Sequence, residues 1–267
     1  MNRPPAGGID TATPNVARIY DYLLGGKDNF AADREAAEQL LVSIPDIAAI
    51  CRDNRAFLIR VVRYLTAEIG IRQFLDLGGG LPTQSNVHQV AQQIAPDARV
   101  VYVDHDPVVW SHGQALLVHD DGAEIVRADL TKPADVLGSP EVSGLLDFTR
   151  PVAVLCTAAL HFISDEDGAQ EAIAAYREHL APGSYLAITH GSEEGYDPYG
   201  DSEAASSVYS KSSAQLHPRT IPEILRFFDG FELVEPGLVW LSEWRPDLRV
   251  PPAGRLTSLR ACVGRKP

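Results

Sequence analysis

The sequence predicts an α/β protein built on a doubly wound, mostly parallel sheet. Three short apolar segments, residues 74–77, 99–104 and 124–130, each carry an acidic residue at or next to their carboxyl end. Helix-like apolar spacing follows the first two, and such alternation of strands with helices is typical of parallel sheets. With 267 residues, of which 45% are hydrophobic, the chain is long enough for one large domain or a main domain with a cap.

Three helices are predicted ahead of the first strand. The first has its cap at Thr13, with Pro14 in its first turn and Gly25 at its end. The second and third cover residues 33–42 and 46–66. The chain is thereby divided into a disordered lead, a helical cap over the carboxyl ends of the strands and a core, which comprise residues 1–12, 13–70 and 71–267.

Asn54 and Arg55 fall on the apolar side of the third helix. A buried arginine needs a partner. One interpretation is that Arg55 meets the carboxylate of a ligand while Asn54 hydrogen-bonds nearby. The other is an internal salt bridge from Arg55 to Asp21 or Asp53.

Residues 74–83 indicate a strand, a tight glycine turn and the start of a helix. The glycines at 78–80 let the backbone adopt positive φ and approach a ligand closely, although a plain strand-to-helix turn would use them too. Thr83 stands where a dinucleotide-binding fingerprint has its third glycine, and no Gly-Lys-Ser/Thr follows as in a P-loop. Asp76 would accept hydrogen bonds from a cationic or hydroxyl-bearing ligand and would repel a phosphate.

Two further acids extend this edge of the sheet. Asp104 ends the strand 99–104 and is well placed to take both hydroxyls of a ribose. Asp129 closes the strand 124–130. The three acids together predict a site for a nucleoside that carries no phosphate.

These residues resemble the class I S-adenosylmethionine-dependent methyltransferases, which bind their cofactor with a glycine loop after strand one, a ribose-binding acid after strand two and an adenine-contacting acid after strand three. More narrowly, residues 15–30, 75–83 and 234–237 resemble a bacterial family of S-adenosyl methyltransferases with an N-terminal helical cap, and the resemblance spans nearly the whole chain. The chain departs from the broader pattern at Pro82, where a third glycine is usual, and from the narrower one at Gly79, where threonine is usual.

The resemblance implies a Rossmann-like, seven-stranded sheet whose last strand is antiparallel, with S-adenosylmethionine as the cofactor. The cofactor contacts that it implies are Asp76, Gly78, Gly79, Gly80, Asp104, His105, Asp129 and Leu130, joined by Asn54 and Arg55 from the cap. The candidate substrate contacts are Tyr20, Asn29, Phe30, His190 and Tyr209. No metal is expected, and the regular spacing of His105, His112 and His119 is assigned to solvated surface.

The second half of the chain supplies a candidate catalytic residue. A buried strand begins at Pro151, and the turn after it brings His161 near the ligand edge. A neutral imidazole with the ordinary pKa of about 6.5 would act as a general base; the alternative is a structural histidine that closes the strand. After a helix over residues 167–180, His190 ends the strand 185–190 and carries the same two interpretations.

The rest of the chain contains a long polar segment and a closing pair of strands. The segment of residues 191–215, which includes Tyr209, is long enough to form a lid or a binding loop. The alternative is a mobile insertion with a short helix around 203–210. A helix near residues 220–228 and two strands, 231–236 and 256–263, follow.

The composition of the chain limits the kinds of partner and the compartment that we expect. A net charge of -13 argues against nucleic acid and anionic membranes. No apolar signal segment opens the chain, and the longest apolar run, residues 152–163, is shorter than the ~20 residues of a membrane helix. Cys51, Cys156 and Cys262 are widely spaced, as expected for buried thiols in the reducing cytoplasm.

The leading hypothesis is an enzyme that moves the methyl group of S-adenosylmethionine to a small-molecule acceptor by in-line displacement. The first alternative is a non-catalytic protein that binds or senses S-adenosylmethionine or S-adenosylhomocysteine. The second is an NAD-dependent oxidoreductase, against which Thr83 counts. The identity of the acceptor depends on cap and loop residues that no general motif describes, and the sequence does not define an oligomeric state.

Overall fold

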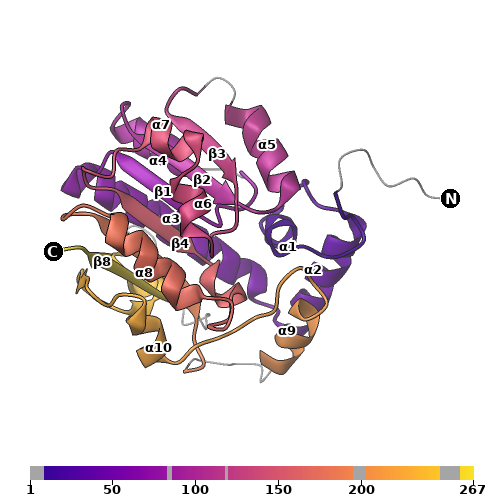
Figure 1. Cartoon of the computed structure of the whole chain (residues 1–267). Helices are drawn as coiled ribbons and strands as arrows, with labels where there is room; N and C mark the ends of the chain where they lie inside the picture. The colour runs from indigo at the N-terminus through magenta and orange to yellow at the C-terminus, as the bar shows by residue number, and fades with distance from the viewer. Residues whose placement is uncertain (1–8, 83–85, 118–119, 195–201, 247–258) are drawn as a thin grey trace.

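The computed structural model describes residues 9–82, 86–117, 120–194, 202–246 and 259–267 (Figure 1). Several features of the sequence analysis lie outside these residues. They are most of the lead 1–12, Thr83, His119, part of the segment 191–215, and the start of the closing strand 256–263.

One sheet of eight strands forms the centre of the molecule, in the order β3-β2-β1-β4-β5-β8-β6, with β7 paired to β8 outside this path. The strands are β1 Gln73–Leu77, β2 Arg99–Asp104, β3 Ala123–Arg127, β4 Ala153–Thr157, β5 Tyr185–Gly191, β6 Glu232–Leu233, β7 Val239–Trp240 and β8 Leu259–Arg265. Strands β1 to β5 are parallel, and β8 is antiparallel to β5, β6 and β7. The Rossmann-like sheet with an antiparallel closing strand is therefore confirmed, and the two-residue β7 is added to the seven strands expected.

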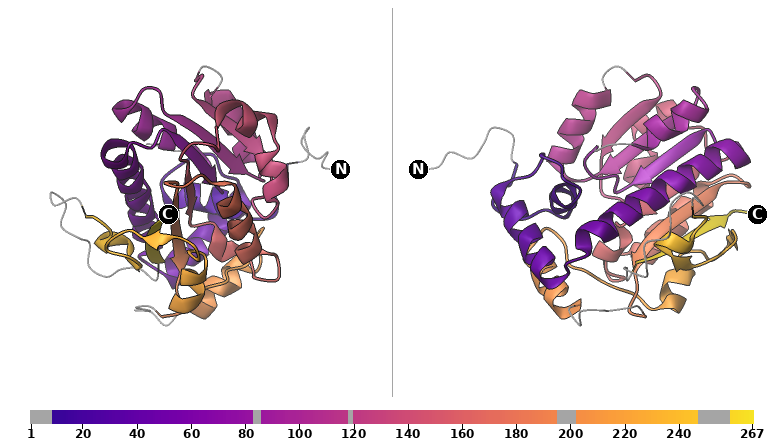
Figure 2. Two further views of the ribbon diagram at one scale, coloured as in Figure 1. Left: turned by 60° about the vertical axis from the view of Figure 1, so that its left-hand side comes forward. Right: turned by 180° about the vertical axis from the view of Figure 1, so that it is seen from behind.

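Helices lie on both faces of this sheet, as expected for a doubly wound fold. The helices of the described residues are α1 Val16–Leu23, α2 Ala31–Ser43, α3 Ile47–Tyr64, α4 Val87–Ile94, α5 Pro107–Leu117, α6 Pro133–Leu137, α7 Pro140–Leu145, α8 Ala169–His179, α9 Ser202–Tyr209 and α10 Ile221–Arg226, with single turns at Leu65–Ile69, Leu160–Phe162 and Leu241–Glu243. Of these, α1, α2 and α9 lie beyond the strand ends and not on a face of the sheet. Seen from behind, the long α3 runs across one face of the sheet, and α8 lies on the other (Figures 1 and 2).

Strand parity divides the apolar residues between these two faces, because successive side chains of a strand point to opposite sides. Leu75 and Leu77 pack in the core beneath α8, whereas Phe74 packs with Phe57 of α3 in the other core. Trp244 is fully buried in this second core and meets the ring of Phe57 edge to face. Both faces of the central strands are therefore buried, and the carboxyl ends of the strands are left as the place for a site.

A third, smaller core joins α1, α2 and α9 to the start of α3 beside the carboxyl ends of the strands (Figure 1). Its buried members are Ile19, Leu23, Ala36, Ala37, Leu40, Cys51 and Val208. The segment expected to be a lid or an insertion thus contains a helix, α9, which packs against α2. Ile47 and Tyr209 are partly buried at the edge of this core.

The start of α1 differs from the sequence prediction, which put the cap at Thr13. The cap is Asn15, whose Oδ1 accepts hydrogen bonds from the backbone N–H groups of Ala17 and Arg18. Arg18 donates to the carbonyl oxygens of Asp10 and Thr13. The helix begins later because these hydrogen bonds, together with the one from the N–H of Asn15 to Asp33 Oδ1, hold residues 10–15 in a non-helical path.

Within the described segments, no helix combines the length and apolar character needed to cross a membrane. The same part of the chain has no cluster of three or more histidine, cysteine or acidic side chains arranged to hold a metal ion.

Candidate active site

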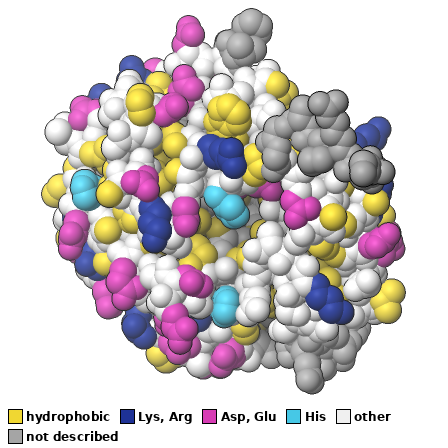
Figure 3. Space-filling view, turned by 45° about the vertical axis from the view of Figure 1, so that its right-hand side comes forward, with side chains coloured by type: hydrophobic (Ala, Val, Ile, Leu, Met, Phe, Trp, Pro, Cys, Tyr) yellow, Lys and Arg dark blue, Asp and Glu magenta, His cyan; other side chains and the backbone are white. Residues whose placement is uncertain are grey.

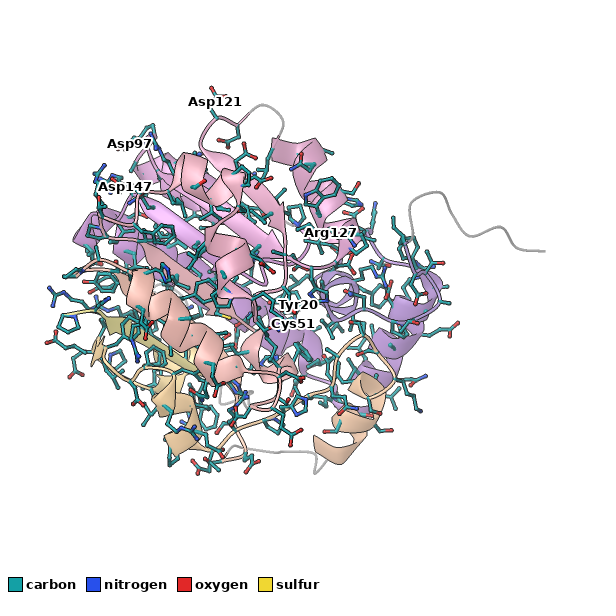
Figure 4. All side chains as sticks on the ribbon, viewed as in Figure 1. Tyr20, Cys51, Asp97, Asp121, Arg127 and Asp147 are labelled. Atoms are coloured by element: carbon teal, nitrogen blue, oxygen red, sulfur yellow. The ribbon has the colours of Figure 1, made fainter. Side chains whose placement is uncertain are left out.

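A cavity of about 680 Å³ lies at the carboxyl ends of the parallel strands, between the sheet and helices α1, α3 and α9. The expected site residues that line it are Tyr20, Asn54, Arg55, Gly78, Gly79, Gly80, Asp104, His105, Asp129, Leu130, His161 and Tyr209. In the space-filling view the surface is hollowed near its centre (Figure 3). Tyr20 and Cys51 lie next to each other between the N-terminal helices and the sheet, far from Asp97 and Asp147 at the opposite end (Figure 4).

The glycine loop forms one wall of the cavity. The N–H groups of Gly78 and Gly79 both donate to the carbonyl oxygen of Val103, at 2.8 and 3.2 Å, which ties the loop to β2. Gly78 has a φ of 71°, and a Cβ added there would lie 2.7 Å from the Cβ of Ala159. Gly80 has a φ of 66°, but a Cβ there would meet nothing within 4 Å. Glycine is therefore required at 78 by packing and by φ, and at 80 by φ.

Asp104 is held rigidly beside this loop. Its Oδ2 accepts a hydrogen bond from the N–H of Gly80 at 3.0 Å, and its Oδ1 accepts one from the N–H of Asp106 at 2.9 Å. Burial raises the pKa of the Asp104 carboxyl, and the two backbone donors act in the opposite direction. Because each carboxylate oxygen can accept a second bond, the fixed group can still receive hydroxyl donors from the cavity.

The residues next to the other strand ends are more open to solvent. Asp129 is exposed, and its Oδ1 accepts hydrogen bonds from both the N–H and the hydroxyl of Thr131, each at 2.8 Å. His105 is exposed too, with Nδ1 4.0 Å from Asp104 Oδ1. These groups form the outer rim of the cavity near β2 and β3.

Asp76 lies elsewhere than expected. It lines a separate small void of about 20 Å³ behind the glycine loop, together with Arg55, Asn86 and Tyr102. Strand parity explains this position, because Asp76 shares the α3 face of β1 with Phe74. Burial raises the pKa of Asp76 to about 7, against a lowering effect of the Arg55 guanidinium.

We expect Asp76→Asn to remove a pH dependence from the stability of the fold. An acid whose pKa is near 7 in the folded protein and 3.8 in its ordinary state gives stability at low pH that is lost as the pH rises through 7. At 1.36 kcal/mol per pKa unit, the wild type should lose about 3 kcal/mol relative to the variant between pH 5 and pH 8. Urea unfolding of both proteins at the two pH values measures this difference, and an equal difference at both would contradict it.

Arg55 reaches the glycine loop from α3 and lines both cavities. Its Nη2 donates to Asn86 Oδ1 at 3.0 Å. Of the internal partners suggested by the sequence, Asp21 accepts hydrogen bonds from the side chain of Asn29 and the N–H of Asp28. The positive charge of Arg55 lowers the pKa of the Asp76 carboxyl.

A chain of hydrogen bonds connects the sheet to the N-terminal helices through Asn54. The N–H of Ala158 donates to Thr189 Oγ1, whose hydroxyl donates to Asn54 Oδ1, at 2.8 and 2.7 Å. Asn54 Nδ2 donates to the hydroxyl of Tyr20 at 3.0 Å, and that hydroxyl donates to the carbonyl of Cys51 at 2.9 Å. Ala158 itself has a φ of 54°, a strained value for a residue with a Cβ. The chain therefore fixes an unusual backbone at the end of β4.

His161 lies in the cavity wall, but its pKa differs from the ordinary value that the sequence hypothesis assumed. It is buried, and its Nδ1 accepts a hydrogen bond from the N–H of Gly191 at 3.3 Å. Burial, with the nearby His190 and Arg219, lowers the pKa of His161 well below its ordinary value of 6.5. The ring is thus neutral near pH 7, and Nε2 carries its proton because Nδ1 is the acceptor. A titration near pH 6.5 is not expected of this residue.

His190 is not part of the cavity lining, which corrects its assignment as a substrate contact. Its side chain is fully buried, with Nδ1 2.8 Å from the carbonyl of Gly191 and Nε2 2.7 Å from Arg219 Nη1. Burial lowers the pKa of His190 to about 4. Both ring nitrogens are therefore used within the protein.

Asn29 and Phe30 are also outside the cavity lining. Asn29 Nδ2 donates to Asp21 Oδ2 at 2.9 Å and to the carbonyl of Gly26. The ring of Phe30 lies under the guanidinium of Arg18, 5.1 Å from its centroid. These two residues shape the loop between α1 and α2, so their role as substrate contacts is not supported.

Arg219 is a buried residue near the site that the sequence analysis did not identify. Its guanidinium donates to the carbonyl oxygens of Leu160 and Ile163 and forms an ion pair with Asp165 at 2.6 Å. It thereby holds the turn that carries His161 against the end of β5. A lone arginine in the polar segment before α10 gives no periodic signal, so only the fold shows this role.

The comparisons with known proteins agree with this geometry. Residues 3–267 match the family model described as S-adenosyl methyltransferase. A DUF574 family protein from Streptomyces avermitilis MA-4680 is 41% identical, with a TM-score of 0.91 over 97% of this chain and 99% of that one. A proposed methyltransferase from Thermobifida fusca YX is 43% identical, with a TM-score of 0.90 over 99% of each chain.

A more distant structure shares only the fold. The N-methyltransferase NodS from Bradyrhizobium japonicum WM9, solved with S-adenosyl-L-homocysteine, is 13% identical, with a TM-score of 0.51 over 94% of this chain and 99% of that one. The comparison with curated proteins gives no match. The family result sets aside the NAD-dependent oxidoreductase alternative. The chain belongs to the S-adenosyl methyltransferase family, and the protein is a methyltransferase.

Proposed function

We propose that this protein binds S-adenosylmethionine in the 680 Å³ cavity and transfers its methyl group to a small-molecule acceptor. The observation that carries the proposal is the fixed Asp104 carboxylate, which is held by two backbone donors next to the glycine loop and lines the cavity. A rigid acceptor of this kind at the end of the second strand suits the two hydroxyls of a ribose.

The charges of the cavity fit this cofactor. Among the described residues that line the cavity, the acidic ones are Asp21, Asp104, Asp129 and Glu193, and the arginine is Arg55. S-adenosylmethionine carries a sulfonium, an ammonium and one carboxylate, so it is a net cation without phosphates. The acidic lining attracts it, and Arg55 is a suitable partner for its carboxylate.

The chemistry requires alignment more than proton transfer. When bound, S-adenosylmethionine would supply an electrophilic methyl group to a heteroatom of the acceptor and be left as S-adenosylhomocysteine, and the acceptor's proton would be lost to bulk solvent when the products leave the cavity. The protein would exclude water from the reactants with α1, α3 and α9, while the fixed hydrogen bonds of Asn54 and Tyr20 keep α1 and α3 against the end of the sheet. Neutral His161, with its proton on Nε2, is suited to donate a hydrogen bond to the acceptor.

We expect Arg55→Met to weaken S-adenosylmethionine at least tenfold more than methylthioadenosine, which lacks the amino-acid group. The physical reason is the loss of a charge-assisted hydrogen bond to the ligand carboxylate, about 1.5 to 3 kcal/mol. Isothermal calorimetry with both ligands measures the two affinities. Arg63→Met, an exposed change on the same helix, is the matched control, and equal weakening of both ligands by the Arg55 change would refute the assignment.

Catalysis itself is tested by incubating the protein with methyl-labelled S-adenosylmethionine and a metabolite extract. Label in a new small molecule supports the enzyme and identifies the acceptor. Tight cofactor binding without a labelled product across several extracts would instead favour the non-catalytic sensor.

A further inference from the structure

We infer that the methyl acceptor is a neutral, largely apolar compound built on an aromatic or comparably flat ring system. The inference rests on the proposed function and extends it, because it concerns the apolar part of the same cavity. We call this part the acceptor chamber. Its apolar lining is formed by Ile44, Ile47, Ile50, Phe162, Ile163, Tyr209 and Leu216.

Aromatic rings form one wall of the acceptor chamber. The rings of Phe162 and Tyr209 meet at a centroid distance of 5.1 Å and an angle of 60°, and those of His161 and Phe162 meet at 4.5 Å and 65°. Phe162 and Tyr209 are only partly buried although they line an internal cavity. Flat apolar molecules pack well against such edges and faces.

Branched aliphatic side chains form another part of the chamber lining. Ile44 lies just before α3, and Ile47 is its first residue. Both contact the small N-terminal core and also line the cavity. Their partial burial leaves apolar surface available to a ligand. Pockets in which a few polar groups orient a ligand and apolar groups supply contact area are the usual form of a small-molecule site.

Two polar side chains of the cavity lining, Tyr20 and Asn54, are already engaged by the protein. The hydroxyl of Tyr20 donates to the carbonyl of Cys51 and accepts from Asn54. Asn54 Oδ1 accepts from Thr189. For an acceptor with many hydrogen-bonding groups, the free-energy cost of desolvation would therefore exceed the free energy gained from hydrogen bonds in the chamber.

The charges exclude an anionic acceptor. The arginine of the described cavity lining, Arg55, lies at the glycine loop beside Asn86 and Asp76. Arg219 stands behind the chamber wall, 4% exposed and paired with Asp165. A carboxylate or phosphate on the acceptor would find acidic neighbours such as Glu193 instead.

A cationic acceptor is excluded by the reaction. The acceptor heteroatom must approach the positively charged sulfonium methyl to within about 3 to 3.5 Å. A second positive charge there would repel the sulfonium, and a protonated amine has no lone pair to attack with. A neutral acceptor avoids both penalties.

The test uses two naphthalene compounds of similar size and different charge, 1-naphthol and 1-naphthoate. Equilibrium dialysis at pH 7 measures their binding to the full protein with saturating S-adenosylhomocysteine. We expect 1-naphthol to bind at least tenfold more tightly than 1-naphthoate. Equal or tighter binding of 1-naphthoate, or no binding of 1-naphthol while S-adenosylhomocysteine is bound, would overturn the inference.

Location is tested by filling the chamber. Ile47→Trp should reduce the affinity for 1-naphthol at least tenfold and leave the affinity for S-adenosylhomocysteine within about threefold of wild type. If this variant does not fold, Leu216→Trp is used in its place, with the same expected result. The control is Val42→Trp, at a position that is 83% exposed on α2. Unchanged 1-naphthol binding in a folded chamber variant would refute the location. Calorimetry with S-adenosylhomocysteine alone tests the proposed function separately: no binding there would refute the proposed function, whereas binding of S-adenosylhomocysteine without a preference for 1-naphthol would refute only the acceptor inference.

Discussion

Asp33→Asn should lower the free energy of unfolding by about 3 to 5 kcal/mol, the usual cost of breaking a buried ion pair by removing one partner. Asp33 is fully buried, and its Oδ2 lies 3.1 Å from Nε of Arg18, which is itself 3% exposed. The carboxylate also accepts the N–H groups of Asn15 and Phe30, each at 2.8 Å. Removal of the negative charge leaves the Arg18 guanidinium buried without compensation. Urea unfolding at pH 7 measures the loss.

Two further variants make this result specific. Glu35→Gln removes an exposed acid from the same helix and should change stability by less than about 0.5 kcal/mol. Arg18→Met combined with Asp33→Asn should be destabilised by less than the sum of the single variants, because residues in one ion pair are coupled. Strict additivity, or a loss below about 1 kcal/mol for Asp33→Asn, would show that the pair does not stabilise the fold.

Asp104→Ala should weaken S-adenosylmethionine by roughly 100-fold or more. The proposed site gives this carboxylate two ribose hydroxyls, and each charge-assisted hydrogen bond is worth about 1.5 to 3 kcal/mol. The loss of the backbone contacts to Gly80 and Asp106 would also loosen the glycine loop. Isothermal calorimetry gives the affinity, and unfolding curves show whether the variant is folded.

The controls separate ligand contact from loop support. Asp104→Asn keeps the shape of the side chain and one acceptor oxygen, so its affinity should fall between those of the wild type and the alanine variant. Asp121→Ala changes an exposed acid at the periphery of the molecule and should have no effect (Figure 4). Affinity of Asp104→Ala within twofold of wild type would put the ribose elsewhere.

The sheet was predictable because its signals are local. Short apolar strands, the glycine turn and the acids at strand ends depend on residues close together in the chain, and the cavity lining does include Gly78, Gly80, Asp104 and Asp129. Parity along β1 even contained the information that Asp76 shares a face with Phe74, away from Leu75 and Leu77.

The missed features depend on contacts between distant residues. The start of α1 is set by Arg18 and Asp33, which no capping rule connects. In β5 all seven residues are buried, so the alternation of apolar and polar residues that would distinguish its faces is absent. Thr189 therefore points to Asn54 and His190 to Arg219, although the sequence suggested that His190 meets the substrate.

The small core shared by α1, α2 and α9 also bears on how a ligand enters the cavity. It is separate from the two cores that stabilise the sheet, and far fewer buried side chains contribute to it among the described residues. Local opening of a region costs free energy in proportion to the contacts that it breaks. We therefore expect separation of α1, α2 and α9 from α3, which would break the bonds of Tyr20 to Cys51 and Asn54, to cost less than global unfolding, so that an opening equilibrium of these helices governs ligand exchange while the strands that carry Asp104 and the glycine loop stay intact.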